Sequence, residues 1–301
     1  MHAQVAVVVV SYNTRELLLE CLASVAQSAQ SETVEIVVVD NASGDGSYDA
    51  VRQTFPQASV IRNPTNLGFA AACNQAIKST SAEFILLLNS DARLTAQAFE
   101  ALYECVDQNE RCGAAGCRLI DATGAVAINT RNFLTPLNQA FELAGINVGL
   151  KALRRTHQPN LDGRMSDCSV EWIDGACLML RRAALDDAGL FDERFFMYSE
   201  DEELCYRLRK RGWVVCFCAD GSVSHHGGAS SRFNKTDNLR HFFLSQMLFL
   251  SKHRGSYSVL MYDVAMWIVL SLKTVFQPAG ERREAVREQL SALREARVLR
   301  G

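Results

Sequence analysis

Short apolar runs alternate with helical spacings of apolar residues in the N-terminal third of the chain. The runs are rich in β-branched and aliphatic side chains, which predicts buried strands, and the spacings between them predict helices. The predicted strands are Val5 to Val10, Val34 to Val39, Ser59 to Arg62 and Phe84 to Leu88, and the predicted helices follow Thr14 and span Phe69 to Lys78 and Thr95 to Gln108. Because the runs are apolar throughout, we expect an α/β fold with a mostly parallel central sheet flanked by helices.

The pattern changes further along the chain. Strand-like runs return at Cys177 to Leu180 and Trp213 to Cys218, separated by a helix that starts near Glu200. After residue 232 only helical spacings remain, and they predict helices over Leu239 to His253, Tyr257 to Phe276 and Arg282 to Arg300. We therefore predict one domain over 1–232, with halves at 1–110 and 111–232, and a C-terminal helical extension over 233–301.

Composition narrows the class of protein. With 301 residues, 48% of them apolar, the chain can bury a large core, and a net charge of −3 gives no reason to expect a nucleic-acid partner. Ten cysteines are scattered without disulfide-like spacings, which favours reduced thiols in a cytoplasm. Cys216 and Cys218 alternate with apolar residues as one face of a strand, so buried thiols are favoured over a metal or redox site.

Two apolar segments bear on localisation. Val5 to Val10 lacks the flanks of a secretory signal, so export is not expected. Tyr257 to Phe276 is apolar but carries Asp263 and Lys273, which favours a buried or interfacial helix over a membrane span. The last predicted helix is rich in arginine and fits either a solvated helix or a surface for anionic lipid.

Polar residues follow the predicted strands at the edge where parallel sheets bind ligands. No glycine fingerprint lies between Ser11 and Arg15, which argues against a dinucleotide-binding protein. The residues at this edge are Ser11, Tyr12 and Asn13, then Asp40 and Asn41, then Asn89, Ser90 and Asp91.

Two carboxylates at this edge have candidate roles. Asp40 offers acceptors to a nucleobase imide or ribose hydroxyl, with a turn or cap role left open. Asp91 suits Mg²⁺ or Mn²⁺ held jointly with substrate phosphates. By itself, Asp91 would favour a helix cap before Thr95.

A second group of chemical candidates lies between residues 195 and 230. Aromatic residues precede the acidic run Glu200 to Glu203, where a desolvated carboxylate can have its pKa raised toward that of a general base; helix capping competes with this role. His225 and His226 are candidate metal ligands, although a histidine near a strand end is more often only hydrogen bonded. Gly227 and Gly228 allow close backbone approach to phosphate.

In this order, the motifs resemble the family 2 glycosyltransferases, especially the branch of bacterial rhamnosyltransferases, over residues 5–232. The resembling pieces are Val10-Ser11-Tyr12-Asn13, Val39-Asp40-Asn41-Ala42-Ser43, Asn66-Leu67-Gly68-Phe69, Asn89-Ser90-Asp91, Asp174-Gly175-Ala176, Phe191-Asp192-Glu193, Glu200-Asp201 and His225-His226-Gly227-Gly228. Asn89 stands where many relatives have an acidic residue and Ser90 where this branch often has proline, so metal coordination is expected to be sparse without the donor.

The resemblance implies a nucleotide-diphospho-sugar transferase fold of the A type, inversion at the anomeric carbon, and a divalent cation, Mg²⁺ or Mn²⁺, between enzyme and diphosphate. It makes 1–110 the nucleotide-binding half of a catalytic domain and 111–232 the acceptor half. It also implies roles for individual residues: donor binding by Ser11, Tyr12, Asn13, Asp40, Asn66, Gly68, Asn74, Ser90 and Asp91, metal binding by Asp91 and His225, the acceptor or sugar side for Trp172, Asp174, Gly175 and Glu200, and the general base for Asp201.

The implied function is transfer of a sugar from a nucleotide-diphosphate donor to a hydroxyl of a saccharide or lipid-linked saccharide in surface-polysaccharide assembly. Thymidine-diphosphate rhamnose is the expected donor; a uridine-diphosphate hexose and a catalytically inactive sugar-nucleotide-binding protein stay open. A nucleotidyltransferase would need a glycine-rich triphosphate loop near the first strand, which the sequence lacks. We expect the irregular stretch Asn132 to Asp167 to read the sugar hydroxyls, and a cytoplasmic enzyme, with peripheral association at the inner face of the plasma membrane through the C-terminal helices.

Overall fold

The computed structural model describes residues 4–29, 34–145, 169–228, 235–277 and 280–300. The chain divides into two compact units. The first holds Met1–Arg131, Gln158–Arg194 and Asp201–Ser230, and the second holds Asn132–His157, Phe195–Glu200 and Ser231–Gly301. The second unit thus combines the C-terminal helices with two segments from the predicted acceptor half, and the predicted boundary at 232 lies outside the described residues.

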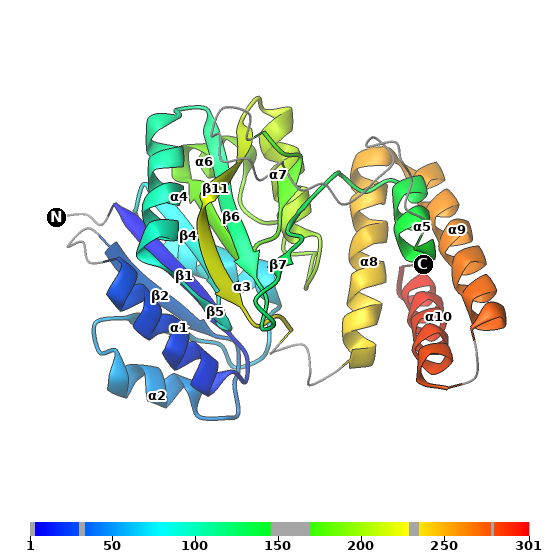
Figure 1. Cartoon of the computed structure of the whole chain (residues 1–301), viewed down its shortest axis with the longest axis horizontal. Coiled ribbons are helices and arrows are strands. Elements are labelled where there is room, and N and C mark those ends of the chain that lie inside the picture. Colours follow the sequence, from blue (N-terminus) through cyan, green and yellow to red (C-terminus); the bar gives the residue numbers. More distant parts are fainter. Residues whose placement is uncertain (1–3, 30–33, 146–168, 229–234, 278–279, 301) are drawn as a thin grey trace. The chain divides into compact units, whose positions relative to one another are not determined.

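A mostly parallel sheet forms the first unit (Figure 1). All its pairings are parallel except those made by β10, β5 and β7, which confirms the predicted fold class. β1 lies between β2 and β4, so the order of strands along the chain reverses direction at β1. Open α/β sheets bind ligands at such a switch point. In order across the sheet the strands are β3 (Ser59–Arg62), β2 (Val34–Asp40), β1 (Val5–Ser11), β4 (Phe84–Asn89), β10 (Cys177–Arg181), β6 (Cys112–Ile120), β11 (Val214–His225) and β5 (Ala92–Arg93), with β7 (Val126–Ala127) beside β6.

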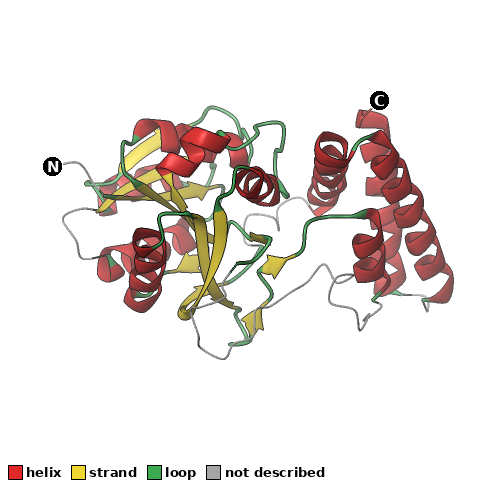
Figure 2. Ribbon diagram, turned by 90° about the horizontal axis from the view of Figure 1, so that it is seen from above, coloured by secondary structure: helices red, strands yellow, loops and turns green. Residues whose placement is uncertain are grey.

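Helices cover both faces of this sheet (Figure 2). The apolar stripes of α1 (Arg15–Ser28), α2 (Ser47–Thr54) and α4 (Ala96–Gln108) pack with alternate residues of β1 and β4 into one core cluster. α3 (Phe69–Ser79) packs against β1 and β2 and contributes nothing to that cluster, so it covers the opposite face. Burial on both faces explains why β1 and β4 are apolar at every position before their last residue. The remaining helices of this unit are α6 (Arg182–Ala188) and α7 (Glu200–Lys210).

Some elements differ from those predicted. β6 contains two alanines and two glycines, a poor strand signal by composition, because its neighbours approach closely: a Cβ on Gly116 would lie 2.5 Å from Ile173. The stretch predicted as irregular contains a helix, α5 (Pro136–Ala144), whose Thr135 and Asn138 form a capping box. Residues 146–168 of that stretch lie outside the described residues, as does the sugar recognition predicted there. Two short strands, β8 (Thr130–Arg131) and β9 (Trp172–Ile173), pair with each other.

The second unit is helical. α8 (Lys235–Arg254), α9 (Ser256–Phe276), α10 (Glu281–Arg300) and α5 run alongside one another (Figure 1), as the C-terminal pattern predicts. Polar contacts inside the bundle join Tyr262 to Gln246 and the Lys273 ammonium to the Leu143 carbonyl. α9 is 21 residues long with mean hydropathy 1.7, so by length and composition it passes the test for a membrane span, and only 22% of its most apolar window is buried.

Candidate active site

The polar residues at the ends of β1, β2 and β4 meet at one edge of the sheet, as predicted from the parallel topology. Ser11 lies opposite Asp40 in the register of β1 and β2. Hydroxyl contacts run from Ser11 to Thr14, 3.1 Å apart, and from Thr14 to Ser90, where the donor-to-acceptor distance is 2.8 Å. All three side chains are buried, so this chain of hydroxyls fixes the end of β1 against the residue after β4.

Asn13 joins the turns that follow β1 and β2. The backbone amide of Asn13 donates to Ser43 Oγ at 3.0 Å, and the side-chain Oδ1 accepts from the Gly44 amide at 2.7 Å. Asn13 and Ala42 both have positive φ, of 54° and 67°, which costs free energy in residues with a side chain and is concentrated at functional sites. Half-buried Tyr12 lies next to this junction.

Asp40 is a buried carboxylate without a hydrogen-bond partner among the described residues. Its exposure is 1%, and the nearest cation, Arg62 Nε, is 4.0 Å from Oδ2. Burial raises the pKa of Asp40, and the neighbouring Ser43 and Arg62 act in the opposite direction. The helix after β2 has Gly46, not Asp40, at its N-cap, so the capping role is absent. A carboxylate left in this state is poised to accept hydrogen bonds from a ligand.

Asn41 organises the loop that carries Asn66 and Gly68. Its Nδ2 donates to Asn66 Oδ1 at 2.8 Å and to the Gly68 carbonyl at 3.1 Å, while its Oδ1 accepts from the Leu67 amide at 3.0 Å. Gly68 has φ of 85°, a conformation that a side chain disfavours, and α3 begins immediately after it. Sequence reasoning placed Asn66 and Gly68 at the donor but did not predict the part played by Asn41.

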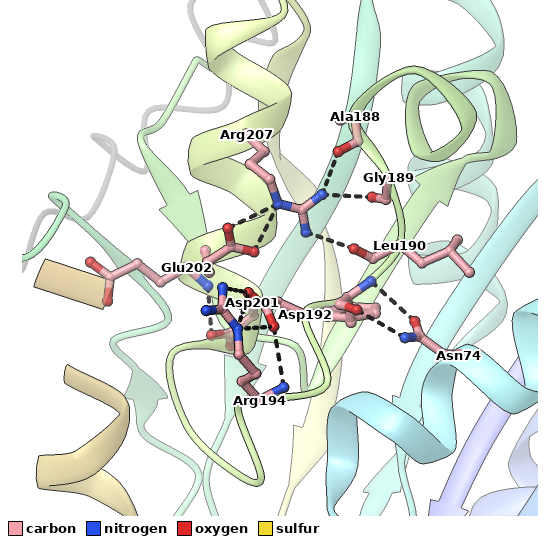
Figure 3. A network of polar contacts seen from close by, with 11 residues as sticks. Asn74, Ala188, Gly189, Leu190, Asp192, Arg194, Asp201, Glu202 and Arg207 are labelled. Carbon is pink, nitrogen blue, oxygen red and sulfur yellow. Dashed lines mark hydrogen bonds and ion pairs between the residues drawn. The ribbon is translucent and has the colours of Figure 1, made fainter. Parts of the chain in front are cut away.

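Asn74, predicted to bind the donor, makes its contacts elsewhere (Figure 3). Its Nδ2 donates to the Phe191 carbonyl and to Glu193 Oε1, both at 2.9 Å, and its Oδ1 accepts from the Phe191 amide at 3.0 Å. The side chain is buried. Asn74 therefore ties α3 to the segment that leads toward α7, and in this structure its amide is turned to protein groups.

Asp91 and His225 form a close carboxylate–imidazole pair. Asp91 Oδ1 lies 3.1 Å from His225 Nε2, and the same nitrogen lies 3.2 Å from Asn89 Nδ2. β11 continues to His225, seven residues beyond the predicted end of the strand at Cys218, and pairs it with Ala92. The adjacent His226 is exposed, and of the two histidines His225 is the one that contacts Asp91 through its side chain.

The pair fits a hard divalent cation. One carboxylate and one imidazole nitrogen converge, and both are competent ligands for Mg²⁺ or Mn²⁺ when phosphate oxygens and water complete the coordination. The competing role for Asp91, a helix cap, is excluded because Thr95 is the N-cap of α4 and accepts from the Ala98 amide at 3.1 Å. Only two protein ligands converge among the described residues here, in keeping with sparse coordination.

Asp201 lies in the first turn of α7 and is held by backbone amides. Its Oδ2 accepts from the Gly175 amide at 2.8 Å and its Oδ1 from the Glu202 amide at 2.7 Å. Burial raises the pKa of Asp201, and these amides together with Arg131 act in the opposite direction. Tyr198 and Ser199, just before α7, have positive φ of 71° and 59°, so a strained turn presents this carboxylate.

Residues 175 and 176 connect the two candidate sites. Gly175 donates to Asp201, and the carbonyl of the next residue, Ala176, accepts from the Asn89 amide at 2.9 Å. Asn89 in turn contacts His225. The candidate base and the candidate cation ligands are therefore joined through the turn between β9 and β10 and the last residue of β4.

Trp172 and Asp174 flank a residue that sequence reasoning missed. Arg131 Nη1 lies 3.3 Å from Asp174 Oδ1, and the Arg131 guanidinium sits 5.6 Å from the Trp172 ring centroid. Trp172, expected on the acceptor or sugar side, is only 4% exposed, and its ring packs under Arg131 in this structure. No local pattern marks Arg131, because it reaches Asp201 only through the pairing of β8 with β9.

A buried ion pair orients α7 (Figure 3). Arg207 Nε lies 2.8 Å from Glu203 Oε2, and its two terminal nitrogens donate to the carbonyls of three successive residues, Ala188, Gly189 and Leu190. These bonds lock the C-terminal end of α6 to α7. In the first turn of α7, Glu200 is buried next to Asp201.

The fold and the site together define a nucleotide-sugar transferase of the A type. A family model described as glycosyl transferase family 2 matches residues 6–187, and the chain belongs to this family. It is a glycosyltransferase that takes its sugar from a nucleotide-sugar donor.

Relatives and solved structures agree with this assignment. The chain is 28% identical over 266 residues to an N-acetylglucosaminyl-diphospho-decaprenol L-rhamnosyltransferase of Mycobacterium tuberculosis, covering 83% of this chain and 85% of the relative. Its fold is similar to a mannosyltransferase from Pyrobaculum calidifontis in complex with GDP-mannose and Mn²⁺, at 15% identity and a TM-score of 0.59, over 99% of this chain and 87% of the other. A structure of GalNAc-T7 with UDP, GalNAc and Mn²⁺ gives a TM-score of 0.60 at 14% identity, over 97% and 54% of the two chains.

Proposed function

We propose that this enzyme transfers its sugar with inversion, using Asp201 as the general base and a divalent cation held by Asp91 and His225. The observation that carries the proposal is the connection from Asp201 through Gly175 and Ala176 to the Asp91–His225 pair. A raised pKa suits Asp201 to take a proton near neutral pH.

The step is a single displacement. An Asp201 oxygen accepts the proton of the acceptor hydroxyl, the acceptor oxygen forms a bond to the anomeric carbon, and the bond from that carbon to the diphosphate oxygen breaks on the opposite face. The nucleoside diphosphate leaves with the bonding electrons. A bound cation supplies charge that offsets the negative charge growing on this leaving group. Buried Asp40, whose oxygens have no hydrogen-bond partner among the described residues, accepts hydrogen bonds from the nucleoside of the donor.

Replacing the base tests the mechanism. Asp201→Asn keeps the size of the side chain but cannot accept the proton, so the turnover number should fall by about 10² to 10⁴, the usual contribution of a positioned base. Donor binding should persist, measured by calorimetry with the nucleotide sugar and Mn²⁺. Asp186→Asn, on the exposed surface of α6, is the matched control. Near-normal turnover in Asp201→Asn would exclude this residue as the base.

Thymidine-diphosphate rhamnose is the donor we propose. It is supported by the rhamnosyltransferase-like motifs and by the similarity to the mycobacterial relative, which is an L-rhamnosyltransferase. A panel of nucleotide sugars with Mn²⁺, scored by product mass, tests it. Faster transfer from a uridine-diphosphate hexose would show that this sugar nucleotide, and not thymidine-diphosphate rhamnose, is the donor. Binding without transfer or hydrolysis across the panel would favour an inactive sugar-nucleotide-binding protein.

The proposed acceptor is a lipid-linked saccharide at the inner face of the plasma membrane, in surface-polysaccharide assembly. One face of α9 supports membrane association. The two charged side chains inside the helix point away from this face, since Asp263 pairs with Arg297 and Lys273 donates to the Leu143 carbonyl. The exposed large apolar residues recur every three or four positions along it and include Tyr257, Leu260, Met261, Val264, Trp267, Ile268, Leu272 and Val275.

The composition of α9 fits an interfacial position better than burial inside the protein. The opposite face, with Val259, Tyr262 and Met266, is already covered by the bundle. Exposed Lys252 and Arg254 precede the helix and suit anionic headgroups. A cytoplasmic enzyme whose apolar face rests on the bilayer would reach a lipid-linked acceptor without crossing the membrane.

A further inference from the structure

Several cysteine thiols converge between α4 and the sheet, away from the Asp91–His225 pair. The sulfur atoms of Cys105, Cys112 and Cys216 all lie within 4.8 Å of one another. Cys105 comes from α4, Cys112 opens β6, and Cys216 belongs to β11, which pairs with β6. Cys218, two residues on and so on the same face of β11, also contacts the Cys105 thiol. Three elements of the fold thus bring three thiols together, and the Cys218 thiol lies against one of them.

We propose that Cys105, Cys112 and Cys216 form a binding site for a thiophilic divalent cation such as Zn²⁺, with Cys218 available as the fourth ligand. Zinc–sulfur bonds of about 2.3 Å in a tetrahedron place the ligand sulfurs about 3.8 Å apart. The observed separations exceed this by no more than about 1 Å, which side-chain rotation can supply. Thiolate ligands select Zn²⁺ over the oxygen-seeking Mg²⁺ and Mn²⁺, so the site is chemically distinct from the donor site.

Cys105 gives the cluster its access to solvent. It is partly exposed, whereas the other thiols of the cluster are buried. An ion arriving from solvent meets Cys105 first, and each further thiol that coordinates releases its proton.

A nearby cation offsets the charge of such a site. A divalent ion with three thiolates carries a net negative charge, which is costly to bury unless it is compensated. Arg181 Nε donates to the Cys112 carbonyl at 3.1 Å, and its Nη2 donates to the carbonyls of Val106 and Asn109. The Arg181 side chain is 11% exposed, and its closest carboxylate, on Glu83, is 3.8 Å away and largely exposed. The guanidinium thus holds the turn between α4 and β6, the two elements that carry Cys105 and Cys112.

The site would stabilise the strand that presents the candidate cation ligand of the active site. β11 carries Cys216 and Cys218 in its first half and His225 at its end. Between Cys218 and Ser222 its register with β6 shifts, so a point that fixes the first half of the strand limits slippage of the second. The cation is therefore assigned a structural role.

Cadmium titration of the full-length, reduced protein tests the site, because sulfur-to-cadmium charge transfer absorbs in the ultraviolet and reports thiolate ligands only. We expect this band to saturate at one equivalent of Cd²⁺ and the thermal midpoint to rise. In Cys105→Ala the band and the rise in midpoint should be lost. Cys73→Ala, which removes a buried cysteine of α3 outside the cluster, should leave both unchanged.

A second measurement needs no variant. Alkylation of Cys105, followed by mass spectrometry of peptides from the native protein, should be suppressed at least tenfold by one equivalent of Cd²⁺. The proposal is overturned if reduced wild-type protein develops no charge-transfer band, or if Cys105→Ala retains it. It is equally overturned if the protein instead loses two hydrogens as a Cys105–Cys112 or Cys105–Cys216 disulfide and binds no metal, since the cluster would then be a redox pair.

Discussion

Three aspartates have different environments in the folded chain. Asp40 is buried without a hydrogen-bond partner among the described residues, Asp91 contacts an imidazole, and Asp201 accepts hydrogen bonds from two backbone amides. A carboxylate without donors suits ligand recognition, one beside an imidazole nitrogen suits a cation, and one with a raised pKa suits proton transfer. Residue type alone does not separate these roles; the immediate neighbours do.

The pair of adjacent histidines gives a matched test of the cation site. His225→Ala removes the nitrogen that lies 3.1 Å from Asp91, so the concentration of Mn²⁺ needed for half-maximal activity should rise at least roughly tenfold, in line with loss of one ligand. His226→Ala alters an exposed neighbour and should leave the Mn²⁺ requirement unchanged. Titrating Mn²⁺ into chelator-treated enzyme measures both. An equal response of the two variants would contradict the assignment.

The pH profile tests Arg131, the residue that sequence reasoning missed. A general base works when deprotonated, so kcat/KM should rise with pH through the raised pKa of Asp201. Arg131 acts to lower that pKa, and therefore Arg131→Gln should move the acidic limb of the profile to higher pH. Arg52→Gln, on the exposed surface of α2, should not move it. A limb that stays in place or moves to lower pH would show that Arg131 does not act on the base.

At the scale of elements, buried polar side chains hold the helices in place. Asn74 of α3 bonds to residues 191 and 193, and Arg207 of α7 bonds to the carbonyls of residues 188 to 190 at the end of α6. Both fix the segment that leads from α6 toward α7. The family resemblance placed Asn74 at the donor, and only the tertiary structure reveals its bond to a segment 117 residues away.

Removing Asn74 should cost stability more than chemistry. Asn74→Ala leaves the buried amide and carbonyl of Phe191 without their partner, a cost of about 1 to 3 kcal/mol for each unsatisfied group. Urea unfolding should show this loss, and donor affinity of the folded fraction should stay near that of the wild type. Gln53→Ala, exposed on α2, serves as control. A large loss of donor affinity with unchanged stability would instead support the donor role.

At the scale of the whole molecule, one helix carries the proposed membrane-binding surface. α9 exposes apolar side chains along its length while its charged residues are bound within the bundle. Single exposed apolar residues are common on soluble proteins, whereas a continuous row of them marks an interaction surface.

Three glutamines on that face should weaken membrane binding. In the variant Leu260→Gln, Val264→Gln, Ile268→Gln, co-sedimentation with vesicles of anionic lipid should fall roughly tenfold or more, because burial of each apolar side chain contributes about 1 kcal/mol or more. Val298→Gln with Leu299→Gln, which changes exposed apolar residues of α10, should bind as the wild type does. If vesicle binding is unchanged, or if the triple variant only dissociates a dimer seen by light scattering, the membrane role is wrong.

Local patterns of the sequence determined the elements. Strands such as Phe84–Asn89 and helices such as Ala96–Gln108 and Ser256–Phe276 lie within one or two residues of their predicted bounds, because side-chain periodicity is set by near neighbours. Strand-end chemistry was also predictable, since parallel strands bring their carboxyl ends to one edge. The poor strand signal of β6 and the helix α5 mark the limit of this reasoning, because close packing and a capping box overrode composition there.

Only the tertiary structure decided which residues meet. The Gly175 amide on Asp201, the Arg131 guanidinium over Trp172 and the thiols of Cys105 and Cys216 join positions from 26 to more than 100 apart in the chain. No local periodicity encodes such distances, since they depend on strand order and register across the sheet. The sequence by itself therefore determined the family, the sheet and the edge at which polar residues gather, while the assignment of charge, burial and partner to each side chain required the fold.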